Sequence, residues 1–514
     1  MPISLYDTTL RDGTQREGLS LSVEDKLKIA RLLDELGILY IEGGWPGSNP
    51  KDAEFFQRIA EEPLRHARVA AFGSTRRVGI RCEDDANLRA LISARTPVVT
   101  VVGKSSTLHV ARVLETTRDE NLAMVGESVA WLAEQGREVV YDAEHFFDGW
   151  ALDPAYALAT LEAAAAAGAS WIVLCDTNGG SLPGAVASVV CAVRDRIRVP
   201  LGIHPHNDSG LAVAVALAAV EAGCEQVQGT INGYGERCGN VDLVPVIANL
   251  QLKLGRAVLA PDRLARLTET SRVVAAIANL NPDSHAPYVG RSAFAHKGGI
   301  HVAAVFKLPG SYQHVDPALV GNEMRVVVSE VAGRRNVRLR AEALGLEDAA
   351  DDGAVLQRIK ELEHRGFQFE AAEGSFEMLL RRSTPGYQPP FELLDFTVIV
   401  EKRGDQAVQA QATVKLRVAG AIMHTAAEGA GPVNALDRAL RKALVPLHPG
   451  LEEVRLVDYK VRIVDEHLGT GAKTRVIVES ARGAERWSTV GCSENIIEAS
   501  WLALWDALEL PLHR

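Results

Sequence analysis

The chain has 514 residues, of which 47% are hydrophobic and 24% charged, and it carries a formal net charge of -11. This length predicts more than one domain, and the absence of a long basic stripe, a signal peptide or an apolar run of bilayer length disfavours nucleic acid or a membrane as a partner. Six cysteines without CxxC spacing fit a reducing cytoplasm better than a disulfide scaffold or a zinc ribbon.

From the N-terminus, eight short β-rich runs alternate with eight amphipathic or Ala-rich helical runs over roughly half of the chain. The expected strands lie at residues 3–10, 40–46, 68–75, 98–103, 138–146, 170–177, 201–208 and 226–233. The expected helices lie at residues 22–37, 51–62, 84–94, 121–136, 154–168, 182–197, 210–223 and 242–255. Eight such pairs, with no GxGxxG after the first strand, predict an α/β fold with a (β/α)8 TIM barrel over residues 1–270. An open doubly wound sheet is the alternative.

The second half of the chain divides into two further regions. Residues 271–390 are less regular, and we expect a mostly helical linker region without a core of its own. Residues 391–514 contain two copies of a βββα unit, which start near Leu393 and Leu456 and predict a C-terminal α+β domain. A cleft between the copies suits a small effector, so the pattern leaves open a regulatory domain or a plain dimerisation module.

Polar residues gather where the expected barrel strands end. Catalytic groups of TIM barrels lie at the C-terminal ends of strands, so these segments are expected to converge on one mouth. The residues are Arg11 and Asp12 (first strand), Glu42 (second), Asp142 and Glu144 (fifth), Asp176 and Thr177 (sixth), His204, His206 and Asp208 (seventh), and Asn232, Glu236, Arg237 and Asn240 (eighth).

The segment HPHND predicts a metal site. His204 and His206 are two residues apart on a strand, so their imidazoles point to the same face. Asp12 adds a carboxylate, and Asn240 can add a carbonyl oxygen. Such a set, completed by water or substrate oxygens, suits Mg²⁺, Mn²⁺ or Zn²⁺ rather than a closed structural zinc site. Two histidines satisfied inside the core are the alternative.

Arg11, next to the expected ligand Asp12, suggests an anion clamp, because a guanidinium can hold an oxyanion or a carboxylate with two hydrogen bonds. Its alternative role is an ion pair with Asp12 or Glu144. Glu144 is a candidate for orienting Arg11 or for general-base work. Asp7 lies on the opposite face of the first strand from Asp12 and is expected to have a structural role.

The run DTTLRDGTQREG, with HPHND and NGYGERCGN, resembles the DRE-TIM metallolyase superfamily, and within it the 2-isopropylmalate, citramalate and homocitrate synthases. The segment FAHKGGIHVAAV resembles the linker motif that carries the family's catalytic histidine, which is His301 here, with Tyr312 as its tyrosine partner. EGAGPVNALDRAL resembles the allosteric domain of the same synthases. The resemblance covers essentially the whole chain.

The resemblance implies a Claisen-type condensation of acetyl-CoA with a 2-oxo acid, followed by thioester hydrolysis. A divalent metal would polarise the keto group, Arg11 would stabilise the oxyanion, and Thr177 would hold the substrate carboxylate. His301 with Tyr312, or Glu144, would act as the base. The family's linker histidine reaches a partner subunit, which implies a homodimer. A hydroxyacyl-CoA lyase of the same superfamily is the alternative, but such lyases usually end after the barrel.

Two stretches bear on the choice of 2-oxo acid. After the second strand the isopropylmalate synthases usually have a Phe-Pro-Ser type sequence, whereas this chain has EGGWPGSNPKD, with Trp45 as the bulky residue. This stretch and DAEHFFDGW resemble the citramalate synthase subgroup. A bulky Trp45 would favour the methyl group of pyruvate over the isopropyl group of 2-oxoisovalerate. Trp45 as simple packing, with 2-isopropylmalate synthase activity, is the alternative. A citramalate pathway ends in isoleucine, so the C-terminal domain is expected to sense isoleucine or leucine.

Overall fold

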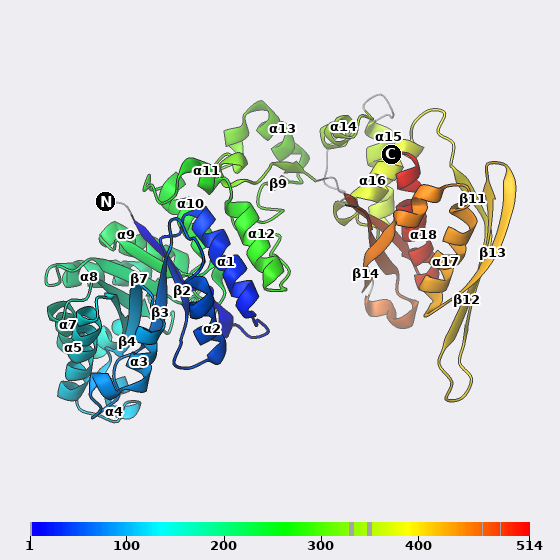
Figure 1. Ribbon diagram of the computed structural model, residues 1–514. Helices are drawn as coiled ribbons and strands as arrows, with labels where there is room; N and C mark the ends of the chain where they lie inside the picture. The colour runs from blue at the N-terminus through cyan, green and yellow to red at the C-terminus, as the bar shows by residue number, and fades with distance from the viewer. Residues whose placement is uncertain (1–2, 328–333, 347–351, 465, 484) are drawn as a thin grey trace. The chain divides into compact units, whose positions relative to one another are not determined.

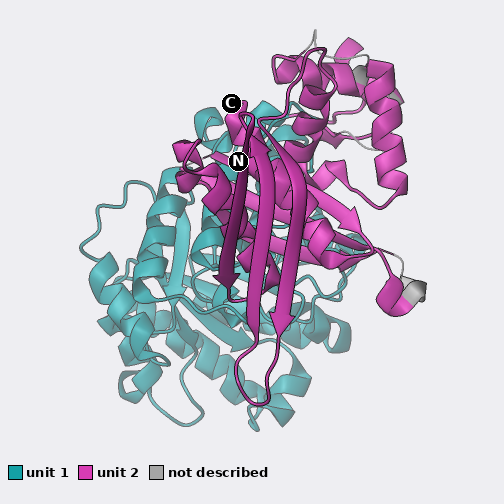
Figure 2. Cartoon of the chain, turned by 90° about the vertical axis from the view of Figure 1, so that its right-hand side faces the viewer, with its two compact units in different colours: residues 1–294, 315–323 teal, residues 295–314, 324–514 magenta. Residues whose placement is uncertain are grey.

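The computed structural model describes residues 3–327, 334–346, 352–464, 466–483 and 485–514 (Figure 1). The chain forms two compact units (Figure 2). Unit 1 contains residues 1–294 and 315–323, and unit 2 contains residues 295–314 and 324–514.

Unit 1 is built on a closed barrel of eight parallel strands in sequential order, in which β1 pairs with both β2 and β8. The strands are β1(Ser4–Asp7), β2(Tyr40–Gly44), β3(Arg68–Ser74), β4(Val98–Lys104), β5(Glu138–Glu144), β6(Trp171–Asp176), β7(Leu201–Pro205) and β8(Gln226–Gly229). Each overlaps one of the expected strand runs, and only β4 extends beyond its run, by the single residue Lys104. The TIM-barrel prediction is therefore confirmed.

Helices follow the strands, and α1 shows the expected signals at both ends. The helix α1(Val23–Leu36) begins with a capping box between Ser22 and Asp25 and ends at Gly37, whose φ of 98° is left-handed. The other helices of unit 1 are α2(Pro50–Ile59), α3(Ala86–Ser93), α4(Thr107–Arg112), α5(Arg118–Glu134), α6(Phe146–Leu152), α7(Pro154–Ala166), α8(Pro183–Arg194), α9(Ala212–Ala222), α10(Leu243–Leu252), α11(Pro261–Leu264) and α12(Leu267–Ile277).

The barrel interior changes from apolar to polar along the strands. One buried cluster contains Tyr6, Tyr40, Ala70, Val98, Val140 and Val173. Residues two apart on a strand share a face, so the next inward positions lie one layer nearer the C-terminal ends. Several of these positions carry buried polar side chains, namely Glu42, Thr100, Asp142 and Gln228. An apolar floor thus supports a polar layer below the barrel mouth.

Unit 2 begins with short elements: β9(Ala295–His296), which pairs with β10(Arg325–Val326), and the helices α13(Gly299–Lys307), α14(Arg334–Ala343), α15(Asp352–His364) and α16(Glu373–Arg382). Buried side chains of α14, α15 and α16 form a cluster that includes Val337, Ile359 and Phe376. The expectation that the linker region lacks a core of its own is therefore wrong. The helices are short and bury apolar side chains against one another, and α16 also packs against β16 and α18.

The rest of unit 2 confirms the repeat. The first copy is β11(Phe391–Glu401), β12(Gln409–Val418), β13(Ala421–Gly429) and α17(Pro432–Leu444), and the second is β14(Arg455–Ile463), β15(Thr474–Arg482), β16(Glu485–Ser493) and α18(Ile496–Glu509). Each copy makes a three-stranded antiparallel sheet. The strand register shifts at matching places, between Leu393 and Asp395 and between Leu456 and Asp458. The likeness of the two copies thus extends to a local irregularity.

No helix among the described residues combines the length and the apolar character that a membrane crossing needs.

Candidate active site

The barrel mouth holds a compact cluster of possible metal ligands. Asp12 lies in the loop after β1, His204 on β7 and His206 just beyond it, and one ligand atom from each lies within 4.8 Å of the others. His204 Nε2 lies 3.2 Å from Asp12 Oδ2, and the centroids of the two imidazole rings are 5.3 Å apart. The side chains are nearly inaccessible to solvent. The first and seventh strands thus bring together two nitrogen donors and one carboxylate.

The charges of this cluster stabilise one another. Burial alone would raise the pKa of Asp12, but the positive charge of Arg11 and the hydrogen bond with His204 hold it well below its usual range. Burial lowers the pKa of His206 to about 4, with the neighbouring His204 adding to the shift. At neutral pH the cluster therefore offers an ionised carboxylate and an uncharged His206 ring, the forms in which these groups bind metals.

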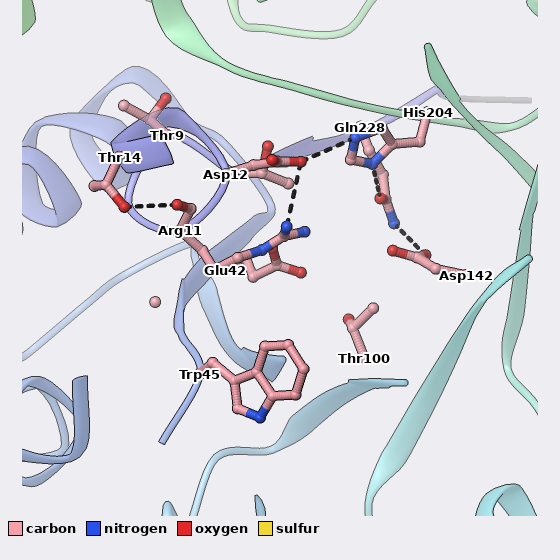
Figure 3. A network of polar contacts seen from close by, with 12 residues as sticks. Thr9, Arg11, Asp12, Thr14, Glu42, Trp45, Thr100, Asp142, His204 and Gln228 are labelled. Carbon is pink, nitrogen blue, oxygen red and sulfur yellow. Dashed lines mark hydrogen bonds and ion pairs between the residues drawn. The ribbon is translucent and has the colours of Figure 1, made fainter. Parts of the chain in front are cut away.

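A buried glutamine orients the first histidine. Gln228 Oε1 accepts a hydrogen bond from His204 Nδ1 at 2.7 Å, and Gln228 Nε2 donates to Asp142 Oδ1 at 3.1 Å (Figure 3). This arrangement places a proton on Nδ1, so Nε2, which faces Asp12, is the ring nitrogen that a metal ion could use in place of that contact. Burial raises the pKa of Asp142 to about 7. The sequence reasoning missed Gln228, which stands inside a strand run and carries no charge that would single it out.

Two neighbouring groups have buried polar atoms without protein partners. Asn240 forms an isolated β-bridge with His206. Among the described residues, neither side-chain polar atom of Asn240 has a hydrogen-bond partner, and His206 Nδ1 has none either. Such atoms cost free energy unless something else satisfies them. Asp12, His204 and His206 form a mixed nitrogen and oxygen set, which fits a divalent cation.

Arg11 is fixed from three sides. Its Nε donates to Glu42 Oε1 at 2.6 Å, its Nη1 lies 3.3 Å from Asp12 Oδ2, and its guanidinium carbon lies 3.8 Å from the centroid of the Phe72 ring. The ion pair with Asp12 is therefore present, whereas the suggestion that Arg11 pairs with Glu144 is wrong. Glu42 belongs to β2, which pairs with β1 in the barrel, and Glu144 belongs to β5.

Glu144 instead forms an ion pair with Lys104, the last residue of β4. The two strands are neighbours, and Lys104 is opposite Glu144 in their register. Both side chains are about three-quarters covered. Lys104 was missed because a single lysine at a strand end is common on protein surfaces.

Trp45 is rigidly placed beside Arg11. Its backbone N–H donates to Asp52 Oδ2 at 2.9 Å, and its indole Nε1 donates to Asn87 Oδ1 at 2.7 Å. The indole also packs edge-to-face on Phe72, with centroids 5.4 Å apart. Asp52 in turn forms an ion pair with the buried Lys26. These contacts hold the indole at the wall of the cleft.

Most of the residues predicted at the strand ends line one cleft, whereas Glu42, Asp176, Asp208 and Asn232 do not. Its lining includes Arg11, Asp12, Trp45, Glu144, Thr177, His204 and His206. Asn240, which was expected among the metal ligands, is not part of this lining and is joined to His206 by the β-bridge. Asp7 is fully buried and accepts hydrogen bonds from the backbone and the hydroxyl of Thr9, as a structural residue would.

His301 and Tyr312 are found together in unit 2. His301 lies on α13, and its ring centroid is 4.3 Å from that of Tyr312, with the rings inclined by 31°. Both side chains are exposed. The expected partnership of these two residues therefore has a geometric basis within unit 2.

Three family models match successive parts of the chain. Residues 2–274 match the HMGL-like family, residues 288–366 the homocitrate synthase post-HMGL domain-like family, and residues 370–512 the LeuA allosteric (dimerisation) domain.

Curated relatives match over nearly their whole length. An (R)-citramalate synthase of Synechocystis sp. is 54% identical over 523 residues, covering 99% of this chain and 96% of that protein. An (R)-citramalate synthase of Geobacter sulfurreducens is 51% identical, covering 100% and 98%. A probable 2-isopropylmalate synthase of Methanopyrus kandleri is 33% identical, covering 97% and 96%.

Proposed function

The chain belongs to the (R)-citramalate synthase family, and we propose that it joins the acetyl group of acetyl-CoA to pyruvate and releases (R)-citramalate and CoA. This reaction is an acyl transfer in which the acetyl methyl carbon attacks the keto carbon of pyruvate, and hydrolysis of the thioester follows. The cluster of Asp12, His204 and His206 beside Arg11 carries the proposal, because it gathers in one cleft the groups that a 2-oxo acid needs.

We propose that Asp12, His204, His206 and Asn240 hold a divalent cation, Mg²⁺, Mn²⁺ or Zn²⁺. The buried atoms of His206 and Asn240 without partners among the described residues support this set. When bound, the cation supplies Lewis-acid polarisation of the 2-oxo group. Gln228 keeps His204 in the tautomer that leaves Nε2 free.

Arg11 is proposed to stabilise the oxyanion that develops on the keto oxygen. Its Nε is occupied by Glu42, but its guanidinium keeps further N–H groups for the cleft. Glu42 and Phe72 fix the plane of the guanidinium before substrate arrives, so little reorganisation is needed in the transition state. Thr177 is placed in the same cleft to donate its hydroxyl proton to the substrate carboxylate.

Removal of a proton from the acetyl methyl group needs a positioned base. The proposed candidates are Glu144, which lines the cleft, and His301 together with Tyr312. Turnover measured for Glu144→Gln and His301→Asn separates them. The base is the residue whose loss abolishes turnover while binding of the 2-oxo acid persists.

Trp45 is proposed to select pyruvate. The indole Nε1 donates to Asn87 and the ring packs edge-to-face on Phe72, so it cannot swing away to admit a larger group without losing these contacts. A fixed wall excludes an isopropyl group sterically, whereas it leaves room for a methyl group.

We further propose three functional parts: a catalytic barrel over residues 1–270, a linker over residues 271–390, and an allosteric and dimerisation domain over residues 391–514. The match to the LeuA domain supports a homodimer and an amino-acid effector, isoleucine or leucine, as expected of a cytoplasmic enzyme of isoleucine biosynthesis. Exposed apolar side chains on the C-terminal strands, including Ile399, Ile422 and Ile463, support an interface there.

A thiol-release assay with acetyl-CoA tests the proposal. Purified protein is given pyruvate, 2-oxoisovalerate or 2-oxoglutarate, with and without Mg²⁺, Mn²⁺ or Zn²⁺. We expect CoA release with pyruvate that depends on the metal and responds to isoleucine or leucine. Release that is much faster with 2-oxoisovalerate would assign the chain to 2-isopropylmalate synthesis, and no release with any acceptor would overturn the synthase proposal.

A further inference from the structure

The loop after β5 holds the side chain of Thr177, which follows β6. The backbone N–H of His145 donates a hydrogen bond to Thr177 Oγ1 at 2.8 Å. We propose that His145 is a positioning residue for the 2-oxo acid: its backbone amide fixes the Thr177 hydroxyl so that the hydroxyl proton is free for the substrate carboxylate. This inference rests on the proposed function and adds the group that orients Thr177.

The chemistry of the hydroxyl gives this bond its direction. A threonine hydroxyl has one proton and two lone pairs, and a backbone amide can only donate. The His145 amide therefore occupies a lone pair of Thr177 Oγ1, and the single proton remains available. Since Thr177 lines the cleft, its hydroxyl can donate this proton in a hydrogen bond to a substrate carboxylate bound there. Without the amide, the hydroxyl is free to rotate and to donate elsewhere.

The backbone of His145 is in an uncommon conformation. Its φ of 55° and ψ of 36° are left-handed, at the junction between the end of β5 and the start of α6. A residue with a side chain pays a cost for this conformation, although histidine is among those that adopt it more often. The conformation sets the direction of the N–H, so whatever stabilises it also aims the amide at Thr177.

Two contacts of the imidazole stabilise this conformation. The ring stacks on that of His109, with centroids 3.8 Å apart and planes inclined by 13°, and its Nδ1 lies 3.3 Å from Asp148 Oδ2. Burial and the neighbouring His145 lower the pKa of His109, so the His109 ring is uncharged at neutral pH. The stack therefore forms without repulsion between two positive rings.

Further bonds tie the same two loops together. Asn178 Nδ2 donates to Asp148 Oδ2 at 2.8 Å, so Asp148 contacts both His145 and the residue after Thr177. Arg237 Nη2 donates to the Thr177 carbonyl oxygen at 2.8 Å. Thr177 is thus held by its own backbone and by its side chain, and only the side-chain contact depends on His145.

Kinetics of four variants of the full-length enzyme test the proposal. His145→Ala removes the ring contacts and keeps the amide in a residue that disfavours the left-handed region. We expect it to raise the KM for pyruvate about tenfold, the effect of a weakened hydrogen bond to a charged group, while the KM for acetyl-CoA is unchanged. His145→Asn tolerates the left-handed region and can still meet Asp148, so it should stay within about threefold of wild type. Thr177→Val should raise the KM for pyruvate at least about tenfold.

The double variant His145→Ala/Thr177→Val decides whether His145 acts through the hydroxyl. If it does, the double variant is no worse than Thr177→Val alone, because the bond is already gone. The matched control is Arg95→Ala. Arg95 is exposed, has the same left-handed φ of 55°, and lies in the turn between α3 and β4. This control should lower thermal stability without changing the KM for pyruvate.

The outcomes distinguish the positioning role of His145 from the substrate-binding role of Thr177. An unchanged KM in His145→Ala, or effects of the two single changes that multiply in the double variant, would overturn the inference while the role of Thr177 stands. An unchanged KM in Thr177→Val would remove Thr177 from substrate binding, and the inference with it. Catalysis by wild type with pyruvate is the separate test of the proposed function itself.

Discussion

Gln228→Leu is the most informative perturbation of the proposed metal site. The change replaces the amide by an apolar side chain inside the barrel and removes the acceptor that lies 2.7 Å from His204 Nδ1. His204 can then rotate or change its tautomer, so Nε2 is no longer held beside Asp12. Loss of the hydrogen-bond partner that orients a metal-binding histidine typically lowers the affinity for the metal 10- to 100-fold, or by about 1.4 to 2.8 kcal/mol.

The same change also leaves buried groups without partners. His204 Nδ1 and Asp142 Oδ1 both lose their hydrogen bond to Gln228, at about 1–3 kcal/mol each. We therefore expect a lower melting temperature of the metal-free protein in addition to weaker metal binding. Isothermal titration of the metal-free protein with Mn²⁺ measures the affinity, and a thermal melt without metal measures the stability.

Thr100→Val is the control that separates the two effects. Thr100 is fully buried in the same polar layer and shares a hydrogen bond with Tyr6, and it has no contact with His204 among its recorded hydrogen bonds (Figure 3). Its loss should reduce stability and leave the Mn²⁺ affinity unchanged. If Gln228→Leu binds Mn²⁺ as tightly as Thr100→Val does, Gln228 does not orient the ligand and the reasoning fails.

Three further predictions concern the wall of the cleft, the guanidinium and the buried carboxyl of β1. Trp45→Ala removes the fixed wall and should raise the ratio of kcat/KM for 2-oxoisovalerate over pyruvate at least about tenfold in the thiol-release assay; an unchanged ratio would show that Trp45 only packs. Arg11→Lys keeps the charge and loses the Nε donor that meets Glu42 and the planar guanidinium, so kcat should fall about 10²- to 10³-fold, and a loss confined to KM would contradict an oxyanion role. Burial raises the pKa of Asp7 to about 7, so the folded chain keeps a proton that the unfolded chain loses near about pH 4, and this carboxyl makes the fold less stable as the pH rises between these values. The free energy of unfolding of Asp7→Asn relative to that of wild type should therefore rise by up to about 4 kcal/mol between about pH 4 and about pH 7. Urea unfolding at several pH values measures this difference, and a difference that does not change with pH would refute the raised pKa of Asp7.

The sequence by itself determined the order and the type of the eight barrel strands and of the C-terminal repeat, but not the additional helices α4 and α6. Strand and helix periodicities are local, so eight alternating pairs were enough to predict the barrel, and the βββα repeat was visible as two aligned copies. The positions of Asp12, His204 and His206 at strand ends followed from the same pattern, because every parallel barrel gathers those ends at one mouth.

Only the tertiary structure decided which side chains meet. Arg11 pairs with Glu42 because β1 lies beside β2, whereas Glu144 on β5 is paired by Lys104 on the neighbouring β4. A single sequence does not point to Gln228 or to the backbone amide of His145. Their roles depend on the hydrogen-bond partners that only the folded chain brings to them. The reason is physical: periodicity depends on residues a few positions apart, whereas a hydrogen bond between strands depends on register and on the closure of the barrel.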